Sequence, residues 1–447
     1  MILRRAHVFG LGVTGRAAVE WLVNDGWTVV ASDDGDSENL RKSATVLRAL
    51  GAEVFLGGHN DALVRPAGLV VLSPGIPPLT PAIQERVRQG AEVIGEIELG
   101  WRHSKGTFAA ITGSNGKSTT TVLLGEIFKQ SGRPAFAVGN IGKPLIEIAG
   151  QTTADSLISL ELSSYQLESI VNFRPKVSAL LNISPDHLER HGNLENYGRA
   201  KARIWENQTE ADFLVFNADD LAVVELVANS RATKVPFSLA GPLTKGGWLE
   251  CDDFVFILPD KQSWKVSRRT STLPGRHNEA NLLAAILMAK LVGVTDEAVI
   301  AGVEAFKGLP HRLEMIRQFE GVYYINDSKA TNVDAGKWAL AATEPPVILL
   351  AGGRPKKGGF KEIRDTISGK VKMIVTFGEA APEIERDLGD LVQVIPTTTL
   401  ADALGIAREH AVPGDTVLLS PLCASFDQFN NFEHRGEVFR QLVTDMK

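Results

Sequence analysis

Short apolar runs alternate with amphipathic stretches along most of the chain. In the first hundred residues the apolar runs are 6–10, 27–34, 52–58 and 68–75, and the stretches with helical spacing between them are 16–26 and 39–51. Strands that alternate with helices form parallel sheets with crossover helices. The sequence therefore predicts an α/β fold.

The same rhythm starts again twice. After the polar segment 102–106, strands and helices are expected at 107–113, 118–132, 155–162, 176–184 and 211–219, then an antiparallel ribbon at 247–268 and a helix at 278–293. A third set is expected at 321–328, 345–353, 371–378, 391–399, 399–411 and 415–421. The pattern predicts three α/β domains, with a boundary near 97–105 and the extents 1–98, 99–308 and 309–447.

Length and composition fit three folded domains. The chain has 447 residues, about three times the ~150 residues of a usual domain. Hydrophobic residues make up 44% and charged residues 22%, as in soluble globular proteins. The net charge of −6 is opposite to the basic surface that binds nucleic-acid backbones, so no nucleic-acid partner is expected.

The cysteines and the lengths of the apolar runs indicate in which cellular compartment the protein is expected. Cys251 and Cys423 are far apart and form no paired motif, which favours a reducing compartment over a disulfide framework or a zinc knuckle. The first residues run into a predicted strand without the apolar region of a secretory signal. No apolar run reaches the ~18 residues of a membrane span. We expect a cytoplasmic protein with no membrane span.

The strongest single motif is the segment 112–119, Thr-Gly-Ser-Asn-Gly-Lys-Ser-Thr, between a predicted strand and a predicted helix. Glycines there let backbone N–H groups face a phosphate, Lys117 reaches the β- and γ-phosphates, and a hydroxyl binds Mg²⁺. Ile111 stands where the longer GxxxxGK[ST] pattern has glycine, so the loop is shortened. An ordinary turn is the alternative, but all parts agree on a nucleoside triphosphate site with contacts at Gly113, Ser114, Asn115, Gly116, Lys117, Ser118 and Thr119.

A second glycine motif follows the first predicted strand. Gly10, Gly12 and Gly15 form GxGxxG before a helix, and Asp33 ends the next strand, near the ~20-residue distance of dinucleotide folds. The motif alone indicates NAD. Because the same turn binds any diphosphate, a nucleotide-sugar substrate fits equally well, and a purely structural turn stays open.

Two histidines lie four residues apart in Asp-His-Leu-Glu-Arg-His. His187 and His191 could bind zinc if this segment were helical. Glu161 ends an earlier predicted strand and Lys201 follows the histidines, so this region offers carboxylate and imidazole groups for a metal near the phosphate loop. A solvated polar loop is an equally good interpretation of the spacing.

Taken together, these segments resemble the Mur ligase family, the ATP-dependent amide-forming enzymes of peptidoglycan precursor synthesis, and folylpolyglutamate synthetase is similar to them in its central and last domains. The resemblance covers essentially the whole chain. It rests on TGSNGKSTT at 112–120, GNIG at 139–142, ELSSYQLE at 161–168, SPDHLERHG at 184–192, YGRAKARI at 197–204, GRHNEANLLAA at 275–285, LPHRLE at 309–314, NDSKATN at 326–332, AGG at 351–353 and SPLCASFDQFNNFEHRG at 420–436.

The resemblance implies a Rossmann-like N-terminal domain, a central P-loop ATPase-like domain and a C-terminal Rossmann-like α/β domain. It also implies that a substrate carboxylate takes the γ-phosphoryl group of ATP and that an amine attacks the acyl phosphate. The segments GLGVTG, GNIG, ELSSYQLE and CASFDQFNNFEHRG resemble members that add D-glutamate to UDP-N-acetylmuramoyl-L-alanine. We therefore expect a monomer that uses ATP, two Mg²⁺ ions and these two substrates.

By the same resemblance, the catalytic residues are Lys117, Glu161, His187 and Lys201. Lys201 matches a lysine that is carbamylated in the family, and a carbamate offers Mg²⁺ the hard oxygens that an ammonium lacks. The implied metal ligands are Ser118, Glu161, His187 and carbamylated Lys201. The other implied contacts are Asn278, Arg312, Asp327 and Lys329 for ATP, Val13, Thr14, Asp33, Asp34, Gly75, Asn140 and Ser163 for the UDP substrate, and Thr331, Lys356, Ser425, Phe426 and Phe432 for D-glutamate.

Two functions of other classes compete with a ligase. An NAD-linked oxidoreductase would use the first glycine motif but leaves the Lys117 loop without a role. A nucleotide-dependent switch would hydrolyse nucleotide without any amine acceptor. Within the family, ligases that add L-alanine, a diamino acid, or glutamate to folate are the rivals.

Overall fold

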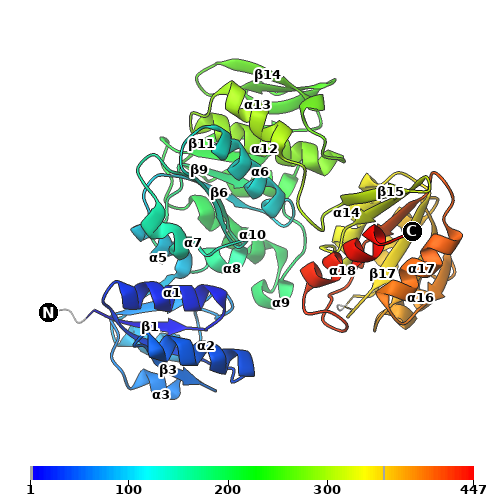
Figure 1. Cartoon of the computed structure of the whole chain (residues 1–447). Helices are drawn as coiled ribbons and strands as arrows, with labels where there is room; N and C mark the ends of the chain where they lie inside the picture. The colour runs from blue at the N-terminus through cyan, green and yellow to red at the C-terminus, as the bar shows by residue number, and fades with distance from the viewer. Residues whose placement is uncertain (1–3, 356–357) are drawn as a thin grey trace. The chain divides into compact units, whose positions relative to one another are not determined.

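The computed structural model describes residues 4–355 and 358–447, and within them three sheets with their helices (Figure 1). The first sheet has the order β3-β2-β1-β4-β5 and is parallel throughout. Its strands are β1 (Arg5–Phe9), β2 (Thr28–Asp33), β3 (Glu53–Leu56), β4 (Leu69–Leu72) and β5 (Glu92–Gly95). The helices between them are α1 (Val13–Asn24), α2 (Glu38–Ala49), α3 (Asn60–Leu63) and α4 (Pro81–Arg88).

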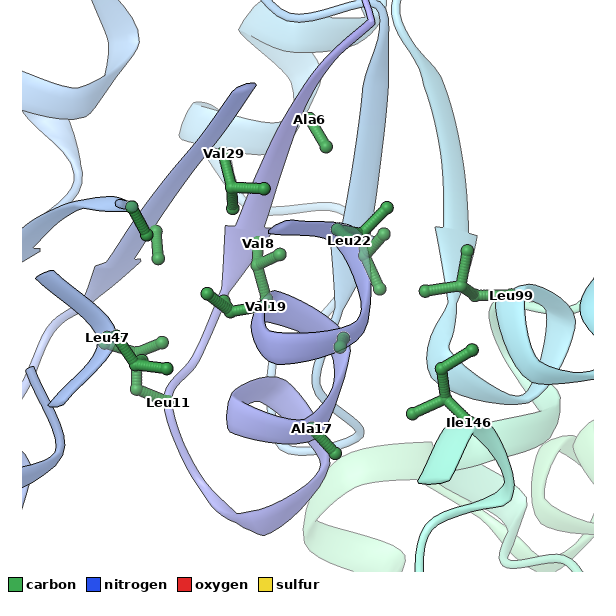
Figure 2. Close-up of a cluster of buried hydrophobic side chains, with 14 of the residues drawn as sticks. Ala6, Val8, Leu11, Ala17, Val19, Leu22, Val29, Leu47, Leu99 and Ile146 are labelled. Atoms are coloured by element: carbon green, nitrogen blue, oxygen red, sulfur yellow. The ribbon is translucent and has the colours of Figure 1, made fainter. Parts of the chain in front are cut away.

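The core of this sheet includes side chains from later in the chain. Val8 and Val29 on neighbouring strands pack with Leu22 of α1, as Figure 2 shows. Leu99 and Ile146 join the same buried cluster from segments beyond β5. The first sheet is therefore packed against the segments that follow it.

The second sheet has the order β14-β13-β12-β11-β10-β9-β6-β8-β7, and its central strand β6 (Thr107–Thr112) leads into α6 (Lys117–Gln130). Its parallel part also contains β7 (Ala135–Gly139), β8 (Leu157–Glu161), β9 (Val177–Leu180), β10 (Phe213–Asn217) and β11 (Thr233–Ser238). The strands β12 (Gly246–Glu250), β13 (Asp253–Ile257) and β14 (Ser263–Ser267) form an antiparallel ribbon.

Helices and short turns connect the strands of the second sheet. They are α7 (Leu145–Ile148), α8 (Ser164–Leu167), α9 (Leu188–His191), α10 (Leu194–Ala202), α11 (Leu221–Val227), α12 (Arg276–Leu291) and α13 (Asp296–Ala305), with 3₁₀ turns at η1 (Ala149–Gln151), η2 (Arg203–Trp205) and η3 (Arg268–Thr270). Several begin at a capping side chain. Ser163 accepts a hydrogen bond from the N–H of Gln166, and Thr295 accepts one from Ala298, which satisfies donors that a helix start leaves unpaired.

The third sheet has the order β15-β16-β20-β17-β18-β19. Its strands are β15 (Glu314–Phe319), β16 (Val322–Asn326), β17 (Val347–Gly352), β18 (Val371–Phe377), β19 (Gln393–Pro396) and β20 (Thr416–Leu419). Only β15 is antiparallel to its neighbour among these described strands. The accompanying helices are α14 (Val333–Ala342), α15 (Arg364–Ile367), α16 (Ala381–Leu388), α17 (Leu400–His410) and α18 (Phe432–Thr444), with η4 (Lys361–Ile363).

The chain divides into two compact units, each described here by itself. The first comprises Met1–Thr272 and Asn278–Phe306, and the second Leu273–His277 and Lys307–Lys447. Across the described part of the chain, none of the helices combines the length and the apolar character that crossing a membrane requires.

The predicted α/β fold with three sets of strands is confirmed, as is the antiparallel ribbon. The sequence pattern missed β5, which has four residues, β7, which contains two alanines and a glycine, and β11 and β15, which carry polar residues at most positions of one face. The predicted boundary at residue 98 falls inside α5 (Glu96–His103). The predicted domain extents stay predictions.

A buried carboxylate on α5 ties this helix to the second sheet. Glu98 is fully buried and accepts hydrogen bonds from the N–H groups of Val171, Asn172 and Phe173, with its nearest oxygen 2.9–3.0 Å from each nitrogen. Arg102 Nε donates to the same carboxylate over 2.9 Å. One buried carboxylate side chain therefore satisfies three backbone donors of the loop after α8.

We predict that Glu98→Ala lowers the free energy of unfolding of the first unit by about 3–5 kcal/mol, because it strands buried donors and an arginine partner. Urea unfolding followed by circular dichroism measures this loss. Glu92→Ala is the matched control: Glu92 also binds Arg102 but its side chain is 49% exposed, so its loss should cost less than about 1 kcal/mol. Equal losses in the two variants would contradict the anchoring role of Glu98.

Candidate active site

The segment between β6 and α6 forms a phosphate-loop turn. Gly116 has the left-handed conformation (φ +83°) and is the N-cap of α6, so that helix begins at Lys117. A Cβ atom at Gly116 would lie 2.3 Å from Asn281 Oδ1, so both the backbone angle and the packing require glycine. Ser118 and Thr119 lie buried in the first turn of α6. The predicted strand, loop and helix are confirmed.

The strand beside β6 anchors this loop. Asn182, which follows β9, accepts a hydrogen bond from the N–H of Asn115 over 2.8 Å and donates one to the carbonyl of Asn115 over 3.1 Å. The N–H of Ser114 donates to the carbonyl of Asn182, and Ser114 Oγ donates to the carbonyl of Ser184. Asn182 and Ser184 were missed by sequence reasoning, because only the strand order brings them to the loop.

Two lysines meet at one carbonyl of the loop. Lys117 Nζ donates to Gly113 O over 2.8 Å, and Lys201 Nζ, from α10, donates to the same oxygen over 2.9 Å. Lys201 is 1% exposed and lies 4.5 Å from the centre of the Tyr197 ring. Burial, and next to it the charge of Lys117, hold the pKa of Lys201 well below its ordinary value. Lys201 is thus set up to be a neutral amine.

Glu161 supplies a buried carboxylate beside the phosphate loop. It ends β8, which pairs with β6 so that Glu161 lies opposite Ile111. Its Oε1 accepts a hydrogen bond from Asn140 Nδ2 over 2.9 Å, while its Oε2 is buried without a hydrogen-bond partner. A buried carboxylate oxygen without a donor fits a cation ligand. The residues present therefore fit a Mg²⁺ ion at this edge.

The two histidines have separate surroundings. His187 has a left-handed backbone (φ 52°) and is 45% exposed beside Asp186 and Glu189. His191 is mostly buried and its Nε2 lies 3.0 Å from Ser164 Oγ. In the described ranges, 4–355 and 358–447, no three His, Cys, Asp or Glu side chains are gathered into a metal site. The zinc interpretation of the histidine spacing therefore gains no support. The magnesium site implied by the resemblance differs, because only Glu161 and His187 in it belong to these residue types and its other ligands are Ser118 and carbamylated Lys201.

The first sheet places its glycine turn at the point where the strand order reverses. A Cβ atom at Gly15 would lie 1.8 Å from Gly10 O and 2.6 Å from Ser73 Oγ, and Ser73 Oγ donates to Gly10 O over 2.8 Å. The loops after β1 and β4 are thereby joined, and ligands of open α/β sheets bind at such a switch point. Val13 and Thr14 open α1 in this turn and Gly75 is exposed in the loop after β4.

Two predicted substrate residues have structural partners of their own. Asp33 accepts from the N–H of Leu11 over 2.7 Å and from the N–H of Gly35 over 2.8 Å. The hydroxyl of Ser163 accepts from the N–H of Gln166 in a capping box. Asp33 therefore shapes the glycine turn itself, and the predicted substrate contacts of both residues stay predictions.

In the second unit, several predicted site residues follow the carboxyl ends of neighbouring strands. Asp327, Lys329 and Thr331 follow β16, and Ser425 follows β20. Asp327 follows β16 and accepts hydrogen bonds from the N–H of Leu313 over 3.2 Å and from Ser420 Oγ over 3.1 Å. Burial raises the pKa of Asp327 to about 7. Lys329 Nζ lies 3.7 Å from the centre of the Phe432 ring, a cation–π contact.

A buried arginine that sequence reasoning gave no role connects the loops after β16, β20 and β17. Arg435, on α18, is fully buried and donates to Ser328 Oγ over 3.0 Å, to Ser328 O over 2.8 Å and to Cys423 O over 3.2 Å. It also lies 3.5 Å from Gly352 O. The motif FEHRG contains Arg435, but only the fold reveals what it holds together.

The remaining predicted residues have mixed surroundings. Ser425 is buried and Phe426 is 64% exposed, while the N–H of Thr331 donates to Lys329 O over 2.8 Å. Asn278, in the first unit, accepts a hydrogen bond from Asn281. The predicted D-glutamate contact Lys356 lies outside the described residues. Arg312, in the second unit, is close enough to Asp327 for its charge to act on that carboxylate.

A phosphate loop on a parallel sheet, together with two further α/β sheets that expose polar residues at their carboxyl ends, defines a nucleotide-dependent enzyme of three α/β parts. Residues 4–95 match the family described as Mur ligase MurD-like, N-terminal domain, residues 111–289 match Mur ligase middle domain, and residues 311–423 match Mur ligase, glutamate ligase domain. The chain belongs to the Mur ligase family.

Curated relatives of nearly full length agree with this assignment. The chain is 41% identical over 448 residues to the UDP-N-acetylmuramoylalanine–D-glutamate ligase of Alkaliphilus metalliredigens, which covers 99% of this chain and 98% of that protein. It is 40% identical over 443 residues to the ligase of the same name from Koribacter versatilis, with the same two coverages.

Solved structures share the fold. A pseudomurein peptide ligase type C from Methanothermus fervidus aligns with a TM-score of 0.62 at 20% identity and covers 99% of this chain and 100% of its own. A UDP-N-acetylmuramate–alanine ligase from Thermotoga maritima aligns with a TM-score of 0.61 at 20% identity and the same coverages. These likenesses concern the fold alone.

We predict that Asp327→Asn stabilises the second unit at pH 8 and removes a pH dependence. Because the pKa of Asp327 is raised to about 7 in the folded chain, from 3.8 in the unfolded one, the folded state keeps this proton longer. Stability should therefore fall as the pH rises from about 4 to about 7 and stay level above, by a total of roughly 4 kcal/mol. Asparagine has no such proton to lose.

Hydrogen exchange of β16 and β20 peptides, measured from pH 5 to pH 8 and corrected for intrinsic exchange, tests this prediction. Burial also raises the pKa of Glu96, to about 7, but Glu96 lies in the first unit and is present in both proteins. The difference between the variant and the parent chain therefore isolates Asp327. A constant difference across this pH range would refute the prediction.

Proposed function

We propose that the chain is an ATP-dependent ligase that joins D-glutamate to UDP-N-acetylmuramoyl-L-alanine. The observation that carries the proposal is the phosphate loop around Lys117 with the buried Lys201 and the half-partnered carboxylate of Glu161 beside it. The full-length similarity to UDP-N-acetylmuramoylalanine–D-glutamate ligases supports the choice of substrates. We infer that it acts as a monomer in the cytoplasm.

The first chemical step would be phosphoryl transfer. A carboxylate oxygen of UDP-N-acetylmuramoyl-L-alanine attacks the γ-phosphorus of ATP, the bond to the β-phosphate oxygen breaks, and ADP leaves. Lys117 at the start of α6 and the N–H groups of the loop 113–119 would face the phosphates and offset the charge that spreads over their oxygens. Because Lys117 already lies within the loop, its ammonium needs only to move from carbonyl to phosphate oxygens.

The second step would be amide formation. The neutral amine of D-glutamate attacks the acyl carbon, and a tetrahedral intermediate forms. It releases inorganic phosphate, while the amine loses a proton. The two carboxylates of D-glutamate are proposed to bind Thr331, Ser425 and Lys356, since a cation and hydroxyls suit carboxylates. Phe426 and Phe432 would border the amino acid.

Magnesium is the proposed metal, and the residues that would hold it are Ser118, Glu161, His187 and carbamylated Lys201. When bound, two Mg²⁺ ions would neutralise charge on the transferred phosphoryl group. The unpartnered Oε2 of Glu161 supports this assignment. Asn140 fixes the other oxygen of the same carboxylate and would thereby orient it.

The surroundings of Lys201 support the proposal that it is carbamylated. The neutral amine attacks CO₂, a C–N bond forms, and one proton leaves, which gives a carbamate with two oxygens. Burial and the charge of Lys117 favour the neutral amine that this reaction requires. Carbamylation would also turn a cation beside the phosphate loop into an anion that a metal can bind.

The other proposed contacts divide by substrate. Asn278, Arg312, Asp327 and Lys329 are proposed to bind ATP in addition to the phosphate loop. Val13, Thr14, Asp34 and Gly75 would bind the UDP end at the glycine turn, where N–H groups at the start of α1 suit a diphosphate, with Asn140 and Ser163 further along the substrate. Asp33 would act through the turn that it shapes.

The decisive measurement is ADP release with ATP, Mg²⁺ and UDP-N-acetylmuramoyl-L-alanine. We expect turnover with D-glutamate and at least about 100-fold less with L-glutamate, L-alanine, diaminopimelate or no amino acid, since a misplaced carboxylate leaves buried charges unpaired. Turnover with another amine would overturn the acceptor. ADP release that is independent of every amine would favour the nucleotide-switch alternative and sink the ligase proposal.

We predict that Lys201→Ala lowers kcat at least about 1,000-fold, in the range that a lost metal ligand and its charge produce, and that added short carboxylic acids restore part of the activity. Intact mass measured under CO₂ should show an added 44 Da on the parent chain and none on the variant. Lys176→Ala is the control, because Lys176 lies on the same unit but its side chain is 43% exposed. No rescue and no added mass would remove the carbamate from the mechanism.

A further inference from the structure

Five side chains form a continuous line of hydrogen bonds through the first sheet. Arg86 of α4 donates to His7 Nδ1 of β1, with its Nη2 at 3.0 Å and its Nε at 3.2 Å. His7 Nε2 lies 2.7 Å from Ser32 Oγ of β2, which lies 2.8 Å from His59 Nδ1. His59 Nε2 lies 3.2 Å from Asp34 Oδ1. The line begins at a fully buried arginine and ends at an exposed carboxylate.

Valence gives this line a single direction. Arginine can only donate, so His7 Nδ1 accepts and His7 carries its proton on Nε2, which donates to Ser32. Ser32 is fully buried, so its own hydrogen goes to His59 Nδ1. His59 therefore carries its proton on Nε2 and donates it to Asp34. Burial, and next to it the charge of Arg86, lower the pKa of His7 to about 2, which keeps His7 neutral and the direction unchanged.

The two adjacent aspartates have different tasks. Both oxygens of Asp33 accept backbone N–H groups within the glycine turn. Asp34 contacts His59, and its side chain is 76% exposed, so its carboxylate can accept further donors from outside. It follows β2 directly, where an acidic residue of dinucleotide folds receives ribose hydroxyls. Asp34 is thus the acid of this turn that a nucleoside can reach.

We propose that His59 and Ser32 are positioning residues for nucleoside recognition: the buried line fixes the tautomer of His59, which holds Asp34 to accept a donor of the nucleoside. The inference rests on the proposed function, which assigns the UDP end to this sheet. The opposite tautomer of His59 would turn a lone pair toward the carboxylate and repel it. Arg86, the cation at the buried end, can only donate, and through His7 and Ser32 it therefore excludes that tautomer of His59.

Kinetics of three single variants test the proposal. Ser32→Ala breaks the line at a residue that no substrate can touch, and His59→Phe keeps a ring against Phe9, whose centre is 4.9 Å away. We expect each to raise KM for UDP-N-acetylmuramoyl-L-alanine about three- to tenfold, the worth of one hydrogen bond. The values of kcat and of KM for ATP and D-glutamate should change less than about twofold. Asp34→Ala should give a rise of the same size or larger.

The double variant Asp34→Ala/His59→Phe distinguishes positioning of Asp34 by His59 from a structural role of His59 that is independent of Asp34. If His59 acts through Asp34, the double variant has the KM of Asp34→Ala alone. Additive effects, or an equal rise of all three KM values, would overturn the proposal. His103→Phe is the matched control, since His103 packs on Trp21 at 4.0 Å in the same unit and should leave every constant unchanged.

Two measurements do not depend on turnover. Long-range ¹H–¹⁵N spectra should show the Nε2–H tautomer for both His7 and His59, and an Nδ1–H signal from His59 would overturn the proposal. If the parent chain releases no ADP with D-glutamate, the proposed function fails, and calorimetric titration with UDP then decides the positioning role. Binding of UDP about three- to tenfold weaker to Ser32→Ala than to the parent would support it, and equal binding would refute it.

Discussion

One backbone carbonyl, Gly113 O, binds two lysine side chains, and the chemistry of the first unit depends on how it does so. Two amines bonded to one oxygen lie within about 6 Å of each other, where two full charges would repel by roughly 3 kcal/mol at an effective dielectric constant of 20. Lys201 is the more deeply buried of the two and its pKa is lowered. The arrangement therefore favours the neutral form of one of the two amines, which the proposed carbamylation of Lys201 requires.

Polar side chains hold the loops in both units. Asn182 pairs with Asn115 in the phosphate loop, Arg435 gathers the loops after three strands of the third sheet, and Ser32 lies in the middle of the line that ends at Asp34. Ser32 lies on β2 and Asn182 just after β9, each next to the loop that it holds, whereas Arg435 reaches its loops from α18. The groups proposed to meet ligands are thus oriented by neighbouring polar partners.

Local patterns predicted much of this structure, but the order of strands could not be predicted from them. The phosphate loop, the GxGxxG turn and most strands follow from periodicity and glycine spacing, because these features need only neighbouring residues. Glu161 comes to lie beside the loop only because β8 pairs with β6. Arg435 belongs to a motif that was recognised in the sequence, yet its three hydrogen-bond partners are between 12 and 107 residues away along the chain. Short strands such as β5 carry too few apolar positions to be recognised.

The first unit combines two different anion turns, and this pairing argues against a redox role for the GxGxxG motif. A dehydrogenase would need one such turn, with an acid for the ribose and no triphosphate loop. In this chain a phosphate-loop turn follows on the next sheet, and a dehydrogenase would have no use for it. Two such turns in one unit suit the proposed enzyme, which would phosphorylate the far end of a nucleotide-linked substrate. The ligase proposal gives both turns a task, whereas the oxidoreductase alternative leaves the second without one.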